Sequence, residues 1–149
     1  MITAEWFAGD GDLTGIHMIR RAVFIGEQGV SEAEEMDGTD MEAIHLLVRD
    51  NGAPVATGRI IVIDEKFYIG RVAVLKEHRG KKYGDFTMRL LIRKAYDMGG
   101  TEQHLHAQTH ARGFYEKLGF TAVSDEYMEA NIPHVDMVRY GDVGGECKI

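Results

Sequence analysis

The pair Asn51-Gly52 constrains the fold more than any other feature of the sequence, because it separates two β-rich runs. These runs are IHLLVRD (residues 44–50) and PVATGRIIVI (residues 54–63). Asn and Gly tolerate the positive φ angles that a tight hairpin turn needs. A third β-rich run, KFYIGRVAVL (residues 66–75), follows directly. The sequence therefore predicts a β-hairpin followed by a third strand.

Helical patterns flank this hairpin on both sides. Apolar residues recur with largely helical spacing over residues 13–28, and Asp12 or Thr14 is a suitable cap. A second helix is predicted from about residue 84 to Gly99-Gly100, and a short one within HARGFYEKLG, where Gly119 ends it. Residues 29–43 are acidic and lack a clean period, which predicts a loop with room for one helical turn.

Short β-rich runs complete the chain. The predicted strands are Ile2–Phe7, 103–108, 120–125 and 134–140, the last two separated by a loop that contains Pro133. The element order is β-α-β-β-β-α-β-α-β-β, and no shift in composition marks a second domain. We expect one α/β (α+β) domain over residues 1–149 on a mixed sheet, with 141–149 as a loose tail.

Charge and cysteine content restrict the classes of function. The formal net charge of -7 argues against nucleic acid as a partner, since a phosphate backbone favours a basic surface. The single cysteine, Cys147, allows no internal disulfide, and no apolar run is long enough to span a membrane. The first residues are neither basic nor continuously apolar, so no signal peptide is expected. These features predict a cytoplasmic protein that does not act on membranes.

Basic and glycine residues gather in front of the second predicted helix. The turn EHRGKKYGDF (residues 77–86) holds Arg79, Gly80, Lys81, Lys82 and Gly84. Backbone N–H groups at a helix start lack helical partners and carry the positive end of the helix dipole, so this arrangement suits phosphate. The alternative is a solvated basic turn. Neither G-x-x-x-x-G-K-[ST] nor G-x-G-x-x-G is present, which argues against a kinase-like or dinucleotide site.

The segment VAVLKEHRGKKYGDFTMRLLIRKA (residues 72–95) resembles the acyl-coenzyme A binding segment of the GNAT N-acetyltransferase superfamily. In that segment of the superfamily, a strand is followed by the motif Arg/Gln-x-x-Gly-x-Gly/Ala and then by a long helix. HARGFYEKLGF resembles a later block of the family, and FIGEQGV, DMEAIHLLV, ATGRI and IPHVDM resemble a small bacterial subgroup. The resemblance extends over about residues 20–139 and implies the GNAT fold, a mostly antiparallel sheet flanked by helices.

One residue departs from that family pattern. Lys82 stands where the pattern has glycine, whereas Gly80 and Gly84 are retained. Lysine fits a helical or extended backbone but is strained at positive φ. We expect coenzyme binding to survive, with Lys82 able to reach a phosphate.

The resemblance implies that an acetyl group moves from acetyl-CoA to a primary amine by direct attack through a tetrahedral intermediate. The coenzyme-binding residues that it implies are Val72, Ala73, Val74, Arg79, Gly80, Lys81, Lys82, Tyr83, Gly84, Asp85 and Phe114. The backbone of residues 72–74 is expected to pair with the pantetheine arm and to supply an N–H to the oxyanion. Tyr115 matches the tyrosine that protonates the leaving thiolate, although an amphipathic core tyrosine is the structural alternative.

The sequence leaves the general base open. The strand FYIGRV (residues 67–72) carries no carboxylate, although many relatives have one there. Glu27 is the first choice as a catalytic base, because the first-helix region borders the acceptor groove in this fold. The other candidates are His45, His106, Glu129 and His134. A water chain without a single base is an equal alternative.

Two further clusters have a functional and a structural interpretation. The carboxylates Glu32, Glu34, Glu35, Asp37, Asp40 and Glu42 would attract a cationic amine or form a solvated loop. His104, His106 and His110 suggest a metal site, but we expect no metal because no cysteine accompanies them.

The rival function is that of a non-catalytic domain, which binds acyl-CoA and serves as a regulatory or interaction module. It has the same expected fold and coenzyme site, so the sequence does not separate it from an enzyme. The acceptor, a small-molecule or peptide amine, is not identified by the sequence. A homodimer is compatible with the resemblance, since dimers are frequent in the superfamily.

Overall fold

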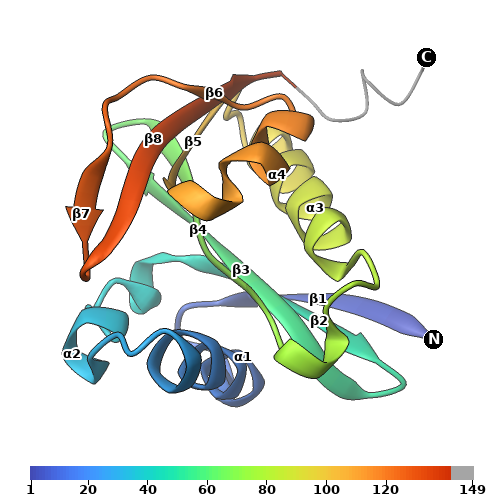
Figure 1. Ribbon diagram of the computed structural model, residues 1–149. Coiled ribbons are helices and arrows are strands. Elements are labelled where there is room, and N and C mark those ends of the chain that lie inside the picture. The colour runs from blue at the N-terminus through green and yellow to red at the C-terminus, as the bar shows by residue number, and fades with distance from the viewer. Residues whose placement is uncertain (142–149) are drawn as a thin grey trace.

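The computed structural model describes residues 1–141, so all of the predicted tail except Gly141 lies outside the described residues (Figure 1). Its strands form one sheet in the order β1-β2-β3-β4-β5-β8-β6, and β7 pairs with β8. The strands are β1 Ile2–Ala8, β2 Ile44–Asp50, β3 Ala53–Ile63, β4 Lys66–Val74, β5 Glu102–Gln108, β6 Thr121–Ala122, β7 Tyr127–Glu129 and β8 Ile132–Tyr140. The mixed, mostly antiparallel sheet confirms the predicted fold class.

The helical segments also follow the predicted order. The α-helices are α1 Thr14–Arg20, α2 Glu32–Glu35, α3 Tyr83–Asp97 and α4 Arg112–Lys117. The π-helix η1 (Arg21–Glu27) continues α1, and short 3₁₀ turns are η2 Asp40–Glu42, η3 Lys76–His78 and η4 Thr109–Ala111. The expected helix over residues 13–28 is therefore present, but its second half is wider than an α-helix. No helix within residues 1–141 is long and apolar enough to cross a membrane.

The Asn51-Gly52 hairpin is confirmed. Asn51 and Gly52 have φ angles of 51° and 85°, and Asp50 pairs with Ala53 across the turn. Asp64 and Glu65, at 50° and 67°, form a second two-residue turn between β3 and β4. Both turns need positive φ at their two central residues, and this matches the twist of the flanking strands.

The predicted C-terminal strands need correction. The strand expected over residues 120–125 contains only β6, a separate strand β7 follows it, and Pro133 lies inside β8 rather than in a loop. The β7–β8 turn is Ala130-Asn131, with φ angles of 51° and 61°. It carries no glycine and therefore gives a weak turn signal. Pro133 pairs with Met128 next to this turn, where antiparallel partners do not exchange hydrogen bonds, so its missing N–H removes no bond from the hairpin.

Two apolar layers hold the helices against opposite faces of the sheet. α3 packs Met88, Leu91 and Ile92 into one cluster with β2–β5 and β8. α1 and η1 pack Ile16, Ile19 and Val23 against Leu47, Ala73 and Leu75 on the other face. Figure 1 shows α1 and α2 together at the lower left and α3 and α4 at the upper right.

A buried ion cluster joins α1, α2 and η2 to β3 and β4. Arg20 donates to Glu35 Oε2 at 2.9 and 2.5 Å and to Asp40 Oδ1 at 2.7 Å. Arg59 donates to the same Asp40 oxygen at 2.8 Å, and Arg71 lies 3.0 Å from Glu35. These carboxylates are therefore neutralised, which leaves less of the acidic segment to attract a cationic amine.

The ion cluster also makes stability depend on pH. Burial would raise the pKa of Asp40, but hydrogen bonds and charges from Arg20 and Arg59, with a further bond from His17, hold that pKa well below its ordinary value. A depressed pKa in the folded state adds stability above about pH 4, where an unfolded Asp is ionised. That stability is lost as the pH falls toward the folded-state pKa.

Arg20→Met should lower the free energy of unfolding by about 3–5 kcal/mol, because it leaves Glu35 and Asp40 buried without their main partner. The adjacent Arg21→Met is the matched control. Arg21 is 49% exposed and pairs with Glu32 on the surface, so its loss should cost less than about 1 kcal/mol. Urea unfolding of both variants measures the difference, and equal stabilities would contradict the structural role of the cluster.

Candidate active site

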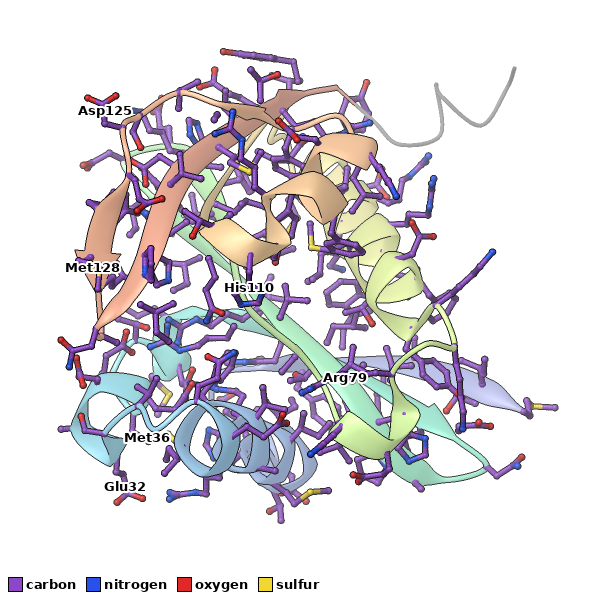
Figure 2. The ribbon with its side chains drawn as sticks, viewed as in Figure 1. Glu32, Met36, Arg79, His110, Asp125 and Met128 are labelled. Carbon is purple, nitrogen blue, oxygen red and sulfur yellow. The ribbon has the colours of Figure 1, made fainter. Side chains whose placement is uncertain are left out.

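The sheet opens where β4 meets β5. The two strands run parallel and pair only at Phe67–Gln103 and Tyr68–His104. Beyond these residues they separate, and a cleft lies between them, lined by residues of η1, β4, the turn before α3, β5 and α4. Figure 2 labels Arg79 and His110, which line the cleft from the turn before α3 and from η4.

The edge of β4 that faces this cleft has no strand paired with it after Tyr68 within the described residues. The N–H of Leu75 donates to Val55 O of β3 at 2.9 Å, so it points away from the cleft. Because successive residues of a strand alternate, the N–H and C=O of Val72 and Val74 point into the cleft. Arg79 Nε donates to Val74 O at 3.1 Å, which agrees with this direction.

A β-bulge sits in the middle of that edge. Thr57 pairs with Ala73 and Arg59 with Gly70, so Gly58 faces both Arg71 and Val72. Arg71 adopts a φ of 52°. A Cβ on Gly58 would lie 2.4 Å from Leu91 Cδ1, so a larger residue between the bulge and α3 would displace the buried Leu91 side chain. Bulges of this kind reorient a strand and are frequent next to active sites.

The turn before α3 contains two residues in the left-handed backbone conformation. Gly80 has a φ of 81°, and Lys82, which caps α3, has a φ of 66° and a ψ of 19°. The expected strain at Lys82 is therefore real, since its Cβ crowds the backbone in this conformation. The first helical residues, Tyr83, Gly84 and Asp85, carry N–H groups that precede the first helical bond, from Phe86 N to Lys82 O.

The cleft gathers nearly all of the residues that the sequence assigned to the coenzyme. Its lining includes Val72, Ala73, Val74, Arg79, Gly80, Lys82, Tyr83, Gly84, Asp85 and Phe114. Lys81 is not in the lining and acts electrostatically on Asp50. The Tyr83 hydroxyl also donates to Asp50, so its side chain points away from the cleft. The coenzyme assignment itself stays a prediction.

Glu27 lines the cleft but is held by Arg79. Arg79 Nη1 and Nη2 donate to the two carboxylate oxygens at 2.9 and 2.6 Å. The hydrogen bond and charge of Arg79 lower the pKa of Glu27 below its ordinary value. A carboxylate with a lowered pKa accepts a proton less readily, so this pair weakens the assignment of Glu27 as general base.

Tyr115 lies in α4 and lines the same cleft. Its ring packs against Phe114 and Phe120 at centroid distances of 5.1 and 6.1 Å. Burial raises the pKa of Tyr115 to about 12, so its hydroxyl stays protonated at neutral pH. The same dry environment raises the pKa of a thiol, which favours proton transfer to a leaving thiolate.

The remaining base candidates divide by position. His45 is buried outside the cleft, with Nε2 3.0 Å from Asp40 O, and burial lowers its pKa. His106, Glu129 and His134 all line the cleft.

Residues 1–141 hold no group of three or more potential metal ligands, and His110 contacts Gln108 at 2.6 Å.

Sequence reasoning missed two contacts, one set by strand register and one by the packing of η1 against β5. Asp136 lies directly opposite His106 on β8. Gln28 and Gln108 exchange amide hydrogen bonds of 3.2 and 2.8 Å between the end of η1 and the end of β5. Neither pair has a local sequence signal, because its members are far apart along the chain.

Lys82→Gly should raise the free energy of unfolding by about 1 kcal/mol, because glycine adopts the left-handed conformation without strain. Lys82→Ala removes the same charge but keeps a Cβ, so it should leave stability nearly unchanged. Urea unfolding separates the two effects. A glycine variant no more stable than the alanine variant would show that Lys82 is not strained.

Comparisons with known proteins agree with this geometry. Residues 15–140 match the family model described as an acetyltransferase (GNAT) domain. The chain is 40% identical over 133 residues to the uncharacterized protein YyaT of Bacillus subtilis, covering 87% of this chain and 90% of that protein. It is 38% identical over 122 residues to the uncharacterized N-acetyltransferase YjcF of the same organism, covering 81% and 87%.

Solved structures give the same result. An acyl-CoA N-acyltransferase from Pseudomonas aeruginosa has a TM-score of 0.85 and 28% identity, covering 93% of this chain and 99% of that one. Escherichia coli ElaA has a TM-score of 0.84 and 30% identity, covering 92% and 99%. The family match over residues 15–140 shows that the chain belongs to the GNAT acetyltransferase family, and the separation of β4 from β5 agrees with it.

Proposed function

We propose that the chain transfers an acetyl group from acetyl-CoA to a primary amine. The observation that carries this proposal is the free edge of β4, which runs from the turn before α3 to the point where β4 and β5 join. The end of the edge beside the turn before α3 is suited to a diphosphate, and its middle is suited to an arm that contains amide groups. The end beside the β4–β5 junction is open to the opposite face of the sheet.

The turn before α3 is the proposed diphosphate site. The N–H groups of residues 83–85 and the positive end of the helix dipole attract phosphate oxygens. Arg79 and Lys82 line the cleft beside them and add charge. In the free protein Arg79 binds Glu27 and Val74 O, so the diphosphate competes with both for the guanidinium.

The pantetheine arm is proposed to lie along β4. Its amides match the exposed N–H and C=O groups of Val72 and Val74, as an added strand would. The four residue steps from Val74 back to Gly70 span about 13 Å of strand. The reactive thioester therefore points toward the bulge and the junction of β4 with β5.

The proposed chemistry needs few side chains, because the thioester is already activated. A lysine-like amine has a pKa near ~10.4 and must lose a proton before it attacks. The proposed donor to the tetrahedral oxyanion is a backbone N–H near Val72. Tyr115 then protonates the departing thiolate.

The comparisons support the coenzyme part of this proposal. The Pseudomonas aeruginosa relative is named an acyl-CoA N-acyltransferase. An aminoglycoside 6'-N-acetyltransferase complexed with coenzyme A shares the fold at a TM-score of 0.72 and 15% identity. The acceptor amine, a cytoplasmic location and a homodimeric state stay predictions from the sequence.

Gly84→Asp should lower the affinity for acetyl-CoA at least about tenfold, because like charges ~4 Å apart near a surface repel by about 1–4 kcal/mol. A Cβ at Gly84 lies 3.5 Å from Phe114 Cζ, so the variant should fold normally. Gly113→Asp is the matched control, since Gly113 is the second residue of α4 and its Cβ would meet nothing within 4 Å. Calorimetry that finds equal losses in both variants would exclude the diphosphate from this turn.

Tyr115→Phe should lower the turnover number for amine acetylation about 100-fold or more while acetyl-CoA affinity persists. The measurement is release of the coenzyme A thiol over a panel of primary amines, with Tyr96→Phe on the exposed side of α3 as control. Unchanged turnover in Tyr115→Phe would remove Tyr115 from the mechanism. Wild-type protein that binds acetyl-CoA but acetylates no amine would favour the non-catalytic binding module.

A further inference from the structure

One half of the sheet carries a row of polar and aromatic side chains on the face that α1 and α2 leave uncovered. Leu105 and Ala107 of β5 point into the core with α3, so the alternate residues His104, His106 and Gln108 point to the opposite face. Their cross-strand partners on β8 are Val138, Asp136 and His134. This face borders the acceptor end of the cleft.

Within this row, three side chains form a closed network. His106 Nδ1 lies 2.7 Å from Asp136 Oδ1 and 2.8 Å from the Tyr127 hydroxyl. The Tyr127 hydroxyl donates to the same Asp136 oxygen at 2.6 Å. Tyr68 of β4 stacks on the other side of the His106 ring, with centroids 5.8 Å apart and planes 6° apart. The ring is therefore fixed in orientation.

The network determines the tautomer of His106. Tyr127 gives its only proton to Asp136, and burial and that hydrogen bond raise the pKa of Tyr127 above its ordinary value. A carboxylate only accepts, so the short contact to His106 requires a proton on Nδ1. In the neutral ring, Nε2 then carries the lone pair. Within residues 1–141 this atom makes no hydrogen bond, and the side chain is 48% exposed in the cleft.

We propose that His106 is the general base that deprotonates the acceptor amine, and that Asp136 positions it. This inference rests on the proposed acetyl transfer. His106 is the first residue on this face of β5 beyond the last β4–β5 pair, Tyr68–His104. It therefore stands at the vertex of the cleft, toward which the thioester points when the arm lies along Val74 and Val72.

The proton balance is complete with groups on this chain. The ammonium form of the acceptor gives one proton to Nε2, directly or through one water, and His106 passes it to solvent. The neutral amine attacks the thioester carbonyl, and the C–N bond forms. When the C–S bond breaks, the thiolate takes a proton from Tyr115, and the second amine proton restores the Tyr115 hydroxyl. The products are an acetamide, coenzyme A and one released proton.

The other groups near the vertex are less suited to this role. Glu27 is bound by two bonds to Arg79. His134 is nearly buried, its Nδ1 lies 2.7 Å from Ile132 O, and its Nε2 lies 3.8 Å from Glu129. The groups that contact the His106 side chain are Asp136, Tyr127 and Tyr68, and the Tyr68 ring also packs against His104. Of these, only Asp136 is a carboxylate.

The pH dependence of kcat/KM tests the proposal. Wild-type protein should lose activity toward low pH along a one-proton limb, because a protonated base cannot accept the proton of the amine. His106→Gln should lower kcat about 100-fold or more and abolish this limb. His104→Gln is the matched control, because His104 lies two residues away on the same face, outside the cleft lining, and pairs with Glu102 at 2.8 Å. It should keep both the rate and the limb.

Two readouts separate catalysis from structure. Added imidazole should restore activity at least tenfold in His106→Gly but not in His104→Gly, because the half-exposed site admits a free base. Asp136→Asn should lower kcat and shift the limb, whereas Asp136→Glu should recover part of the rate. A limb that survives in His106→Gln, or one that disappears instead in Glu27→Gln or His134→Gln, would overturn the proposal.

Nitrogen NMR of the His106 ring keeps the test independent of turnover. At a pH where the ring is neutral, Nδ1 should carry the proton in wild-type protein, and Asp136→Asn should lose that preference. A proton on Nε2 in wild-type protein would overturn the dyad even if acetyl transfer is observed. Wild-type protein with the expected tautomer but no acetylation of any amine would instead refute the proposed function, and the catalytic role of His106 with it.

Discussion

The site depends on the loss of backbone pairing between β4 and β5 after Tyr68–His104. Exposed strand edges normally attract another strand, and buried unpaired backbone groups are costly. Here the cleft leaves the edge of β4 open to solvent, and Arg79 contacts Val74 O in the free protein. A ligand with amide groups would form backbone hydrogen bonds with this edge as a further strand would. The missing pairing between β4 and β5 therefore leaves the surface that recognises the ligand.

Charge is arranged differently at the two ends of the cleft. Near the bulge, Arg20, Arg59 and Arg71 are matched by Glu35, Asp37 and Asp40, so the charges in that region nearly cancel. At the turn, Arg79 pairs with the partly exposed Glu27, which is a partner that a diphosphate can replace. The first arrangement fixes the shape of β4, and the second leaves a cation available for binding.

Local sequence signals predicted much of the fold, and the resemblance to a known family pointed to the turn before α3 as a coenzyme site, which stays a prediction. The Asn51-Gly52 hairpin and the helix end at Gly119 follow from residue types that tolerate positive φ angles, whereas the positive φ of Lys82 before α3 has no such signal in the sequence. The β7 strand was missed because Ala130-Asn131 lacks glycine. The partners of Glu27 and His106 were missed because Arg79 and Asp136 lie 52 and 30 residues away, and only tertiary packing and strand register bring them together.

Thermal stability with acetyl-CoA, coenzyme A and pantetheine tests the central claim most directly, because pantetheine has the arm but lacks the diphosphate. A ligand that binds only the folded protein adds roughly 2.7 kcal/mol at a hundred times its dissociation constant. The cleft described above predicts a clear rise with acetyl-CoA and coenzyme A and little with pantetheine at the same concentration. No rise with acetyl-CoA, or an equal rise with pantetheine, would contradict a coenzyme site built from the β4 edge and the turn before α3.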